Sequence, residues 1–311
     1  MSQELTILGI SAAVTAGIQV CGFAVAYALQ TEKFYDILGG INFLALGIYS
    51  AIDGNSEEDP WVENPRKIAA TAVFCASRSW LLMFLAWRAH DRGGDSRFDE
   101  VKDKFFMFFF FWMFQGIWVF AISLPILMIN GSDKPYDGFS VLDYVCIVAF
   151  ALAVIVEVAA DLQKAIWVKK GREGVFCTTG VWFFSRHPNY FGEILQWWAA
   201  FGIAFGSGIG WSDAQWWTTI ISPLVTMQIL LNTGSTGVMQ ANGTRSLKRY
   251  YDRCPEEYKA YRESTSILIP FIGYKSVPMF LKRTIFFDFK RYEYQPETEQ
   301  DVKIDVAYNS L

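Results

Sequence analysis

Three long stretches of this chain carry no charged residue: 5–29, 105–130 and 214–244. A helix of about 20 apolar residues crosses the hydrocarbon core of a bilayer, so uncharged stretches of this length predict membrane-spanning helices. Four weaker apolar windows complete the set, at residues 35–52, 68–88, 140–160 and 190–211. The sequence therefore predicts an all-α, multi-pass membrane bundle of about seven transmembrane helices.

The composition excludes several other classes of protein. Apolar residues make up 52% of the chain and charged residues 19%, which argues against disordered, collagen-like and coiled-coil proteins. The formal net charge of −4 argues against a general nucleic-acid-binding protein. The five cysteines include no CxxC pair, so neither a disulfide framework nor a zinc site is expected, and no metal site is predicted.

The basic residues are distributed unequally between the two ends of the predicted helices. With seven spans, three lysines and arginines fall on the side that holds the N-terminus and 23 on the other. Positive charge marks the cytoplasmic face of a membrane protein, so we expect the N-terminus on the non-cytoplasmic side. An even number of spans would remove this asymmetry.

The C-terminal part differs from the rest. Pro255, with Glu256 and Glu257 directly after it, predicts the start of a short helix. Residues 267–287 mix apolar side chains with lysines and arginines and are expected to lie along the membrane surface. We therefore divide the chain into a membrane domain, 1–265, and a C-terminal interfacial segment with a polar tail, 266–311.

Ionisable residues inside or at the edge of spans are costly and are candidates for function. Glu157, Asp161 and Lys164 close the fifth predicted span, and their spacing places them on one helical face. They are interpreted either as part of a binding site or as an interfacial ladder of ion pairs.

The segment 185–193 opens the sixth predicted span. Pro188 fits a first helical turn, whose free N–H groups attract phosphate, and Arg186 and His187 add further polar groups. Asn189 and Glu193 are four residues apart and therefore share one face. The alternative is a helix cap with a buried hydrogen-bonded pair.

Two more basic positions belong to this set. Arg78 lies within the third predicted span, where it should face the interior and pair with Asp36, Glu157 or a ligand phosphate. Arg245 follows the seventh span, as a phosphate clamp or as a positive anchor at the membrane surface. The groups at the basic-side ends of spans five, six and seven together predict a site for a bulky, phosphate-bearing cofactor that enters from the basic side.

The segment 185–193, followed by Trp197 and Trp198, resembles the steroid 5-alpha-reductase-like superfamily. The chain as a whole is most similar to its broad multi-pass membrane branch, which is described mainly as a domain of unknown function. The resemblance covers about residues 30–275. It implies a seven-helix membrane reductase that uses NADPH to saturate a carbon–carbon double bond of a lipid or sterol-like substrate.

The resemblance also assigns roles to residues. It implies that Asp161, Asn189 and Glu193 contact NADPH, with Arg186, His187 and Tyr190 as additional candidates from the same motif. The steroid reductases polarise their substrate with a Glu on the second span and a Tyr on the third, and both are missing from these spans here. The candidate catalytic residues are therefore Arg78 with Tyr35 or Tyr49, which would stabilise a developing enolate oxygen.

Two other functions remain open. The missing catalytic pair suggests a non-catalytic membrane subunit of a larger complex, which would need no cofactor. The Arg-His-Pro-x-Tyr-x-Gly pattern also occurs in membrane methyltransferases of the isoprenylcysteine carboxyl type, which bind S-adenosylmethionine. The expected partners are membrane lipids, a hydrophobic small-molecule substrate and other membrane subunits. The family likeness favours the endoplasmic reticulum, with the mitochondrial inner membrane as the alternative.

Overall fold

The computed structural model describes residues 2–54, 64–92, 98–132, 138–172, 176–207, 214–232, 238, 250 and 253–292. In this part of the chain, five helices are long and apolar enough to cross a membrane. They are α1 (Gln3–Leu29), α2 (Tyr35–Asp53), α3 (Pro65–Arg92), α4 (Phe105–Gly131) and α5 (Val141–Lys169). The prediction of a helical, multi-pass membrane protein is thereby confirmed.

Shorter helices follow in the second half of the chain. The expected window 190–211 corresponds to α6 (Pro188–Ser207), and the described start of 214–244 forms η5 (Ala214–Ile220) and α7 (Ile221–Asn232). The last described helices are α10 (Pro255–Ser264), η6 (Tyr274–Ser276), α11 (Met279–Thr284) and η7 (Lys290–Tyr292). Both proline signals are confirmed, since α6 and α10 begin at Pro188 and Pro255.

The chain divides into two compact units. Unit 1 consists of Met1–Ile155 and Gly192–Met227, and unit 2 of Val156–Phe191 and Gln228–Leu311. The last turns of α5 and the first turn of α6 belong to unit 2 together with the C-terminal segment, and the division at residue 265 stays a prediction. The two units are described separately below.

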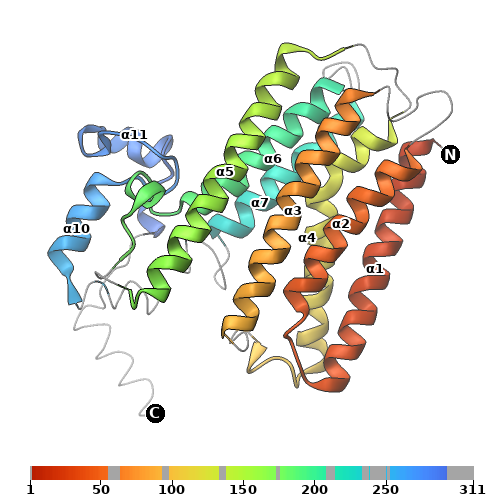
Figure 1. The fold of residues 1–311 in the computed structure, drawn as a ribbon, viewed down its shortest axis with the longest axis horizontal. Helices are drawn as coiled ribbons and strands as arrows, with labels where there is room; N and C mark the ends of the chain where they lie inside the picture. Colours follow the sequence, from red (N-terminus) through yellow and green to blue (C-terminus); the bar gives the residue numbers. More distant parts are fainter. Residues whose placement is uncertain are drawn as a thin grey trace, which may run out of the picture. The chain divides into compact units, whose positions relative to one another are not determined.

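Unit 1 is built around α1, α2, α3 and α4, which lie side by side (Figure 1). Its largest apolar cluster includes Phe43, Phe74, Ile126 and Trp197, each at most 3% exposed. Gly39 allows α2 to approach α4, since a Cβ atom there would lie 2.7 Å from the amide nitrogen of Gln115. Small residues at such crossings are typical of helices that pack within a membrane.

The start of α3 corrects one detail of the prediction. The helix begins at Pro65, so Arg66 and Lys67, which precede the predicted span 68–88, are helical and buried. The Arg66 guanidinium donates to Asp143 Oδ1 and Oδ2 over 3.0 and 2.9 Å. The Lys67 ammonium donates to the carbonyl of Gly54 over 3.2 Å. A buried cation needs such acceptors, because burial without them is costly.

Unit 2 is held together by aromatic residues and by long-range contacts between segments. Trp167, Cys177 and Trp182 form a buried cluster with Ala160. Residues 183–186 run beside residues 265–271, through an isolated parallel bridge between Ser185 and Ser266 and a hydrogen bond of 2.8 Å from Arg186 N to the Ser266 carbonyl. The segment after α10 therefore supports the start of α6.

Candidate functional site

The predicted site residues divide between the two units. Unit 1 contains Tyr35, Tyr49, Arg78 and Glu193, whereas unit 2 contains the others described by the structure. These are Glu157, Asp161, Lys164, Arg186, His187, Asn189 and Tyr190. Arg245 lies outside the described residues. Each group is therefore analysed within its own unit.

Arg78 is completely buried in the middle of α3. Its Nη1 and Nη2 donate to Oε1 and Oε2 of Glu193 over 3.0 and 2.8 Å, which is the two-pronged geometry that a guanidinium and a carboxylate form best. The guanidinium carbon also lies 4.7 Å from the centre of the Trp197 ring and 5.4 Å from that of Phe43. Arg78 does pair with an acid, but the acid is Glu193 and was not among the predicted partners.

Neighbouring polar groups complete this cluster. Arg78 Nη2 also donates to Ser77 Oγ over 2.8 Å and to Gln196 Oε1 over 3.2 Å. The Trp197 indole nitrogen donates to Glu193 Oε1 over 2.9 Å. Glu193, which the resemblance assigned to NADPH, is thus bound to two side chains of its own unit. The arrangement is a buried, hydrogen-bonded ion pair between α3 and α6.

The two candidate tyrosines lie apart from each other. The Tyr35 hydroxyl donates to the carbonyl of Phe111 over 2.8 Å, and the Tyr49 hydroxyl donates to Asp53 Oδ2 over 3.3 Å. Fourteen residues of α2 separate them, which is about 21 Å along the helix axis. One small reacting group cannot contact both.

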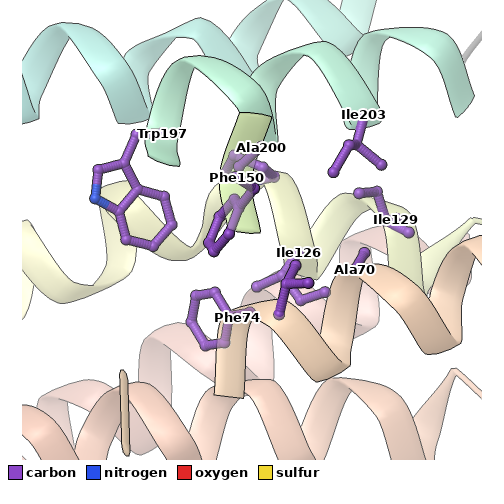
Figure 2. A pocket seen from close by; sticks show the side chains of 10 residues that line it. Ala70, Phe74, Ile126, Ile129, Phe150, Trp197, Ala200 and Ile203 are labelled. Atoms are coloured by element: carbon purple, nitrogen blue, oxygen red, sulfur yellow. The ribbon is translucent and has the colours of Figure 1, made fainter. Parts of the chain in front are cut away.

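A small cavity lies beside Trp197 in unit 1. Its volume is about 10 Å³, and ten apolar residues line it, eight of which are labelled in Figure 2. Phe74, Phe150 and Trp197 gather at one end and Ala70, Ile129 and Ile203 at the other (Figure 2). This volume is about that of one water molecule. The cavity is a packing gap in the bundle, too small for a cofactor or a lipid chain.

In unit 2, the last turns of α5 carry the predicted acidic and basic groups. Glu157 and Asp161 are 6% and 8% exposed. Lys164 places its ammonium nitrogen 4.7 Å from the ring centre of Trp167 and 4.5 Å from that of Trp182. Two aromatic faces hold the position of a cation without neutralising its charge. Trp167 and Trp182 therefore fix the position of the Lys164 ammonium in the last turns of α5.

A short helix, η3 (Gly180–Phe183), places Trp182 beside Lys164. The Trp182 indole nitrogen donates to the Ala160 carbonyl over 3.0 Å, and Val181 N donates to Gln163 Oε1 over 3.0 Å. Gly180 enters this turn with a φ of +60°, a conformation that suits glycine. These contacts fold residues 180–183 back onto α5.

Hydrogen bonds and ring stacking hold the side chains of residues 185–190, which lead into α6. Ser185 Oγ accepts from His187 N over 3.1 Å and donates to the Leu268 carbonyl over 2.7 Å. The His187 ring stacks on Tyr190, with ring centres 5.3 Å apart. Asn189 is half-buried in the first turn of α6. Ser185 thus links the motif to the segment that follows α10.

Arg186 is held by residues that sequence reasoning missed. Its Nη2 donates to Asp288 Oδ2 over 2.9 Å, and the Tyr274 hydroxyl donates to the same oxygen over 2.8 Å. Burial alone would lower the pKa of Arg186, but the carboxylate of Asp288 raises it overall. Asp288 is the single acidic residue between Glu263 and Glu293. This isolation is the sequence feature that could have indicated Asp288 as a partner for a buried cation. Arg186 therefore stays charged within the unit.

His187 is neutral in this setting. Desolvation, followed by the charges of Arg186 and Lys164, lowers the pKa of His187 from 6.5 to about 3. Both cations therefore act on the same imidazole, just before the first turn of α6. The arrangement concentrates positive potential at a helix N-terminus, where free N–H groups also favour anions. The group of three residues, Lys164, Arg186 and His187, is called the basic cluster below.

The described residues contain no cluster of three or more His, Cys, Asp or Glu side chains suited to a metal ion. Among comparisons with known proteins, one family model, described as a protein of unknown function (DUF1295), matches residues 22–265. No curated protein and no solved structure matches the chain. The matched range ends just before the segment that supplies Tyr274 and Asp288.

Proposed function

We propose, from the premise that the chain belongs to the DUF1295 family, that it is a membrane reductase that uses NADPH to saturate a carbon–carbon double bond of a lipid or sterol-like substrate. The proposal is supported by the likeness of residues 185–193 to the steroid 5-alpha-reductase-like superfamily. The observation that carries it is the basic cluster, in which Lys164 and Arg186 both act on His187 at the start of α6.

The residues present fit the anionic part of this cofactor. Lys164 and Arg186 would attract the phosphates of NADPH, and a neutral His187 can hydrogen-bond to them. Glu157 and Asp161, on the same face of α5 as Lys164, would accept from sugar hydroxyls, and Asn189 and Tyr190 would contribute from α6. When bound, NADPH supplies the hydride. Arg245 remains a candidate phosphate clamp.

The residues proposed to act on the substrate fit this reaction less well than those proposed to bind NADPH. In the proposed reaction, Arg78 with Tyr35 or Tyr49 would stabilise negative charge on the substrate. Arg78 is 0% exposed and pairs with Glu193, so it could act only after this pair opens. This ion pair specifically favours a second candidate function, a non-catalytic membrane subunit that keeps the fold of a reductase and serves an assembly.

The proposed topology has seven spans, with α6 as the sixth and 214–232 as the start of the seventh. It places the N-terminus on the non-cytoplasmic side, in the endoplasmic reticulum or, alternatively, the mitochondrial inner membrane. The supporting observation is the distribution of basic residues. Of the three on the N-terminal side, Arg66 and Lys67 are buried in unit 1, and Arg66 is paired with Asp143.

Titration of the purified protein with NADPH, followed by tryptophan fluorescence, tests the proposal. Trp167 and Trp182 contact Lys164, so binding at the basic cluster should quench their emission. Lys164→Met should weaken NADPH binding at least about tenfold, because a hydrogen bond to a charged group contributes about 1.5–3 kcal/mol. Lys170→Met is the matched control, an exposed lysine just beyond α5, and should leave the affinity unchanged.

The other outcomes of this titration would support one of the two alternative functions. Quenching by S-adenosylmethionine without quenching by NADPH would contradict the reductase and favour the methyltransferase. Absence of quenching by either ligand, together with purification in a larger complex, would favour the non-catalytic subunit.

A further inference from the structure

Residues 271–285 of unit 2 present an unusual number of apolar side chains to the outside. Five of them are exposed: Phe271 by 44%, Ile272 by 79%, Met279 by 58%, Phe280 by 73% and Ile285 by 56%. Single exposed apolar residues are common on protein surfaces, but a concentration within one short segment marks an interaction surface. These five residues are called the apolar edge below.

The apolar edge is not a loose tail, because the opposite side of the same segment is anchored. Tyr274 is fully buried and donates to Asp288, and Phe286 is 7% exposed. The Lys282 ammonium lies 4.3 Å from the centre of the Tyr274 ring and donates to the Glu263 carbonyl. The prediction that all of 267–287 lies along the membrane therefore needs refinement, since part of the segment belongs to the core of unit 2.

Within residues 271–292, the exposed charged side chains are all basic, and the exposed acid Glu263 lies on α10, outside this segment. Lys275, Lys290 and Arg291 are exposed, and Arg283 is half-buried. The single acidic residue of this stretch, Asp288, is engaged by Arg186 and Tyr274. The outward-facing charge is therefore positive. Its natural counterpart is an anionic surface.

Two kinds of partner could cover such a surface, a lipid headgroup layer or another protein. Aromatic residues, Met and Arg are enriched in protein interfaces, but lysine is depleted there, whereas lysine beside large apolar side chains is typical of segments that lie in the headgroup region. Five helices of the described residues are also able to span a membrane, and the last of them, α5, continues into unit 2. The combination favours lipid.

We propose that the apolar edge, with Lys275 and Arg283, is a binding surface for anionic phospholipids that seats residues 271–285 in the headgroup region of the bilayer. The apolar side chains enter the boundary between headgroups and acyl chains, and the basic side chains contact lipid phosphates. This surface shares no residue with the basic cluster, and the proposal does not require that the protein be a reductase.

Hydrogen–deuterium exchange of the full-length protein tests this surface. The protein is placed in detergent, in nanodiscs of phosphatidylcholine, and in nanodiscs that also contain phosphatidylglycerol. Amide exchange in the peptides that cover 271–285 should be slowest in the anionic nanodiscs. The difference from neutral nanodiscs should be on the order of fivefold for each basic residue that contacts the surface.

Exposed-site variants make the test specific, because they leave the core of unit 2 intact. Lys275→Glu should remove the difference between anionic and neutral lipid, and Phe280→Ser should raise exchange in both. Lys259→Glu is the matched control, an exposed lysine on α10 with the same change of charge. Equal exchange in all three environments, equal slowing in neutral and anionic lipid, or slowing only when a second protein copurifies would each overturn the proposal.

Discussion

The two compact units use ionisable side chains in different ways. In unit 1, Arg78 pairs with Glu193 and Arg66 with Asp143, and each pair joins two helices. In unit 2, Lys164 is held by aromatic rings, and Arg186 is held by Asp288 from a segment 102 residues away. The comparison teaches that a charge within an apolar sequence does not by itself indicate a ligand. The partner of each charge decides this, and Arg78, Arg66 and Arg186 each pair with a carboxylate of their own unit.

The largest expected effect comes from separating the charges of unit 1. Glu193→Gln leaves the Arg78 cation buried without its carboxylate, which should lower the free energy of unfolding by about 3–5 kcal/mol. Thermal unfolding in detergent measures the loss. The double variant Arg78→Met with Glu193→Met should recover most of it, because an apolar pair of similar volume needs no counter-charge. If Glu193→Gln alone left the free energy of unfolding unchanged, the stability of unit 1 would not depend on this buried ion pair.

A smaller effect is expected from the corresponding contact of unit 2. Asp288→Asn removes the carboxylate that receives Arg186 and Tyr274, and should lower the free energy of unfolding by about 1–3 kcal/mol. The same thermal measurement applies. Glu256→Gln, an exposed acid on α10, is the control and should have no effect. If Asp288→Asn cost more than Glu193→Gln, unit 2 would depend on its charges as strongly as unit 1.

The smallest effect concerns pH. The pKa of His187 is lowered to about 3 in the folded protein, so between pH 3 and 6.5 the unfolded chain binds more protons than the folded one. The stability contributed by neutral His187 is present above pH 6.5 and is lost as the pH falls. His187→Asn should therefore flatten the decline of the unfolding midpoint between pH 7 and 5. His90→Asn, at an exposed position on α3, should not.

The sequence predicted several local features correctly. The uncharged stretches identified α1 and α4, and the weaker windows identified α2, α3 and α5. Pro188 and Pro255 marked helix starts that the structure confirms. These features are local, because the length of an apolar run and the missing N–H of proline act within one helix. The count of seven spans and the orientation remain predictions.

Other features could not be read from the chain. The spacing of Glu157, Asp161 and Lys164 correctly placed them on one helix, but nothing in it indicated that Trp182 would cover Lys164. The contacts of residues 183–186 with 265–271 combine backbone hydrogen bonds, which almost any sequence can form, with bonds from the hydroxyls of Ser185, Thr265 and Ser266, and nothing in the local sequence indicated that these segments would meet. Asp288 stood out only as a lone acid in a basic stretch.

The amino-acid sequence by itself determined that the chain is a helical membrane protein and where most of its helices begin and end, since these depend on apolar length and on local backbone chemistry. The tertiary structure alone decided which charges meet. Glu193 lies 115 residues from Arg78, and it became the partner because α3 and α6 pack together at that depth. A buried charge selects its partner by proximity in the folded bundle, and proximity is a property of packing.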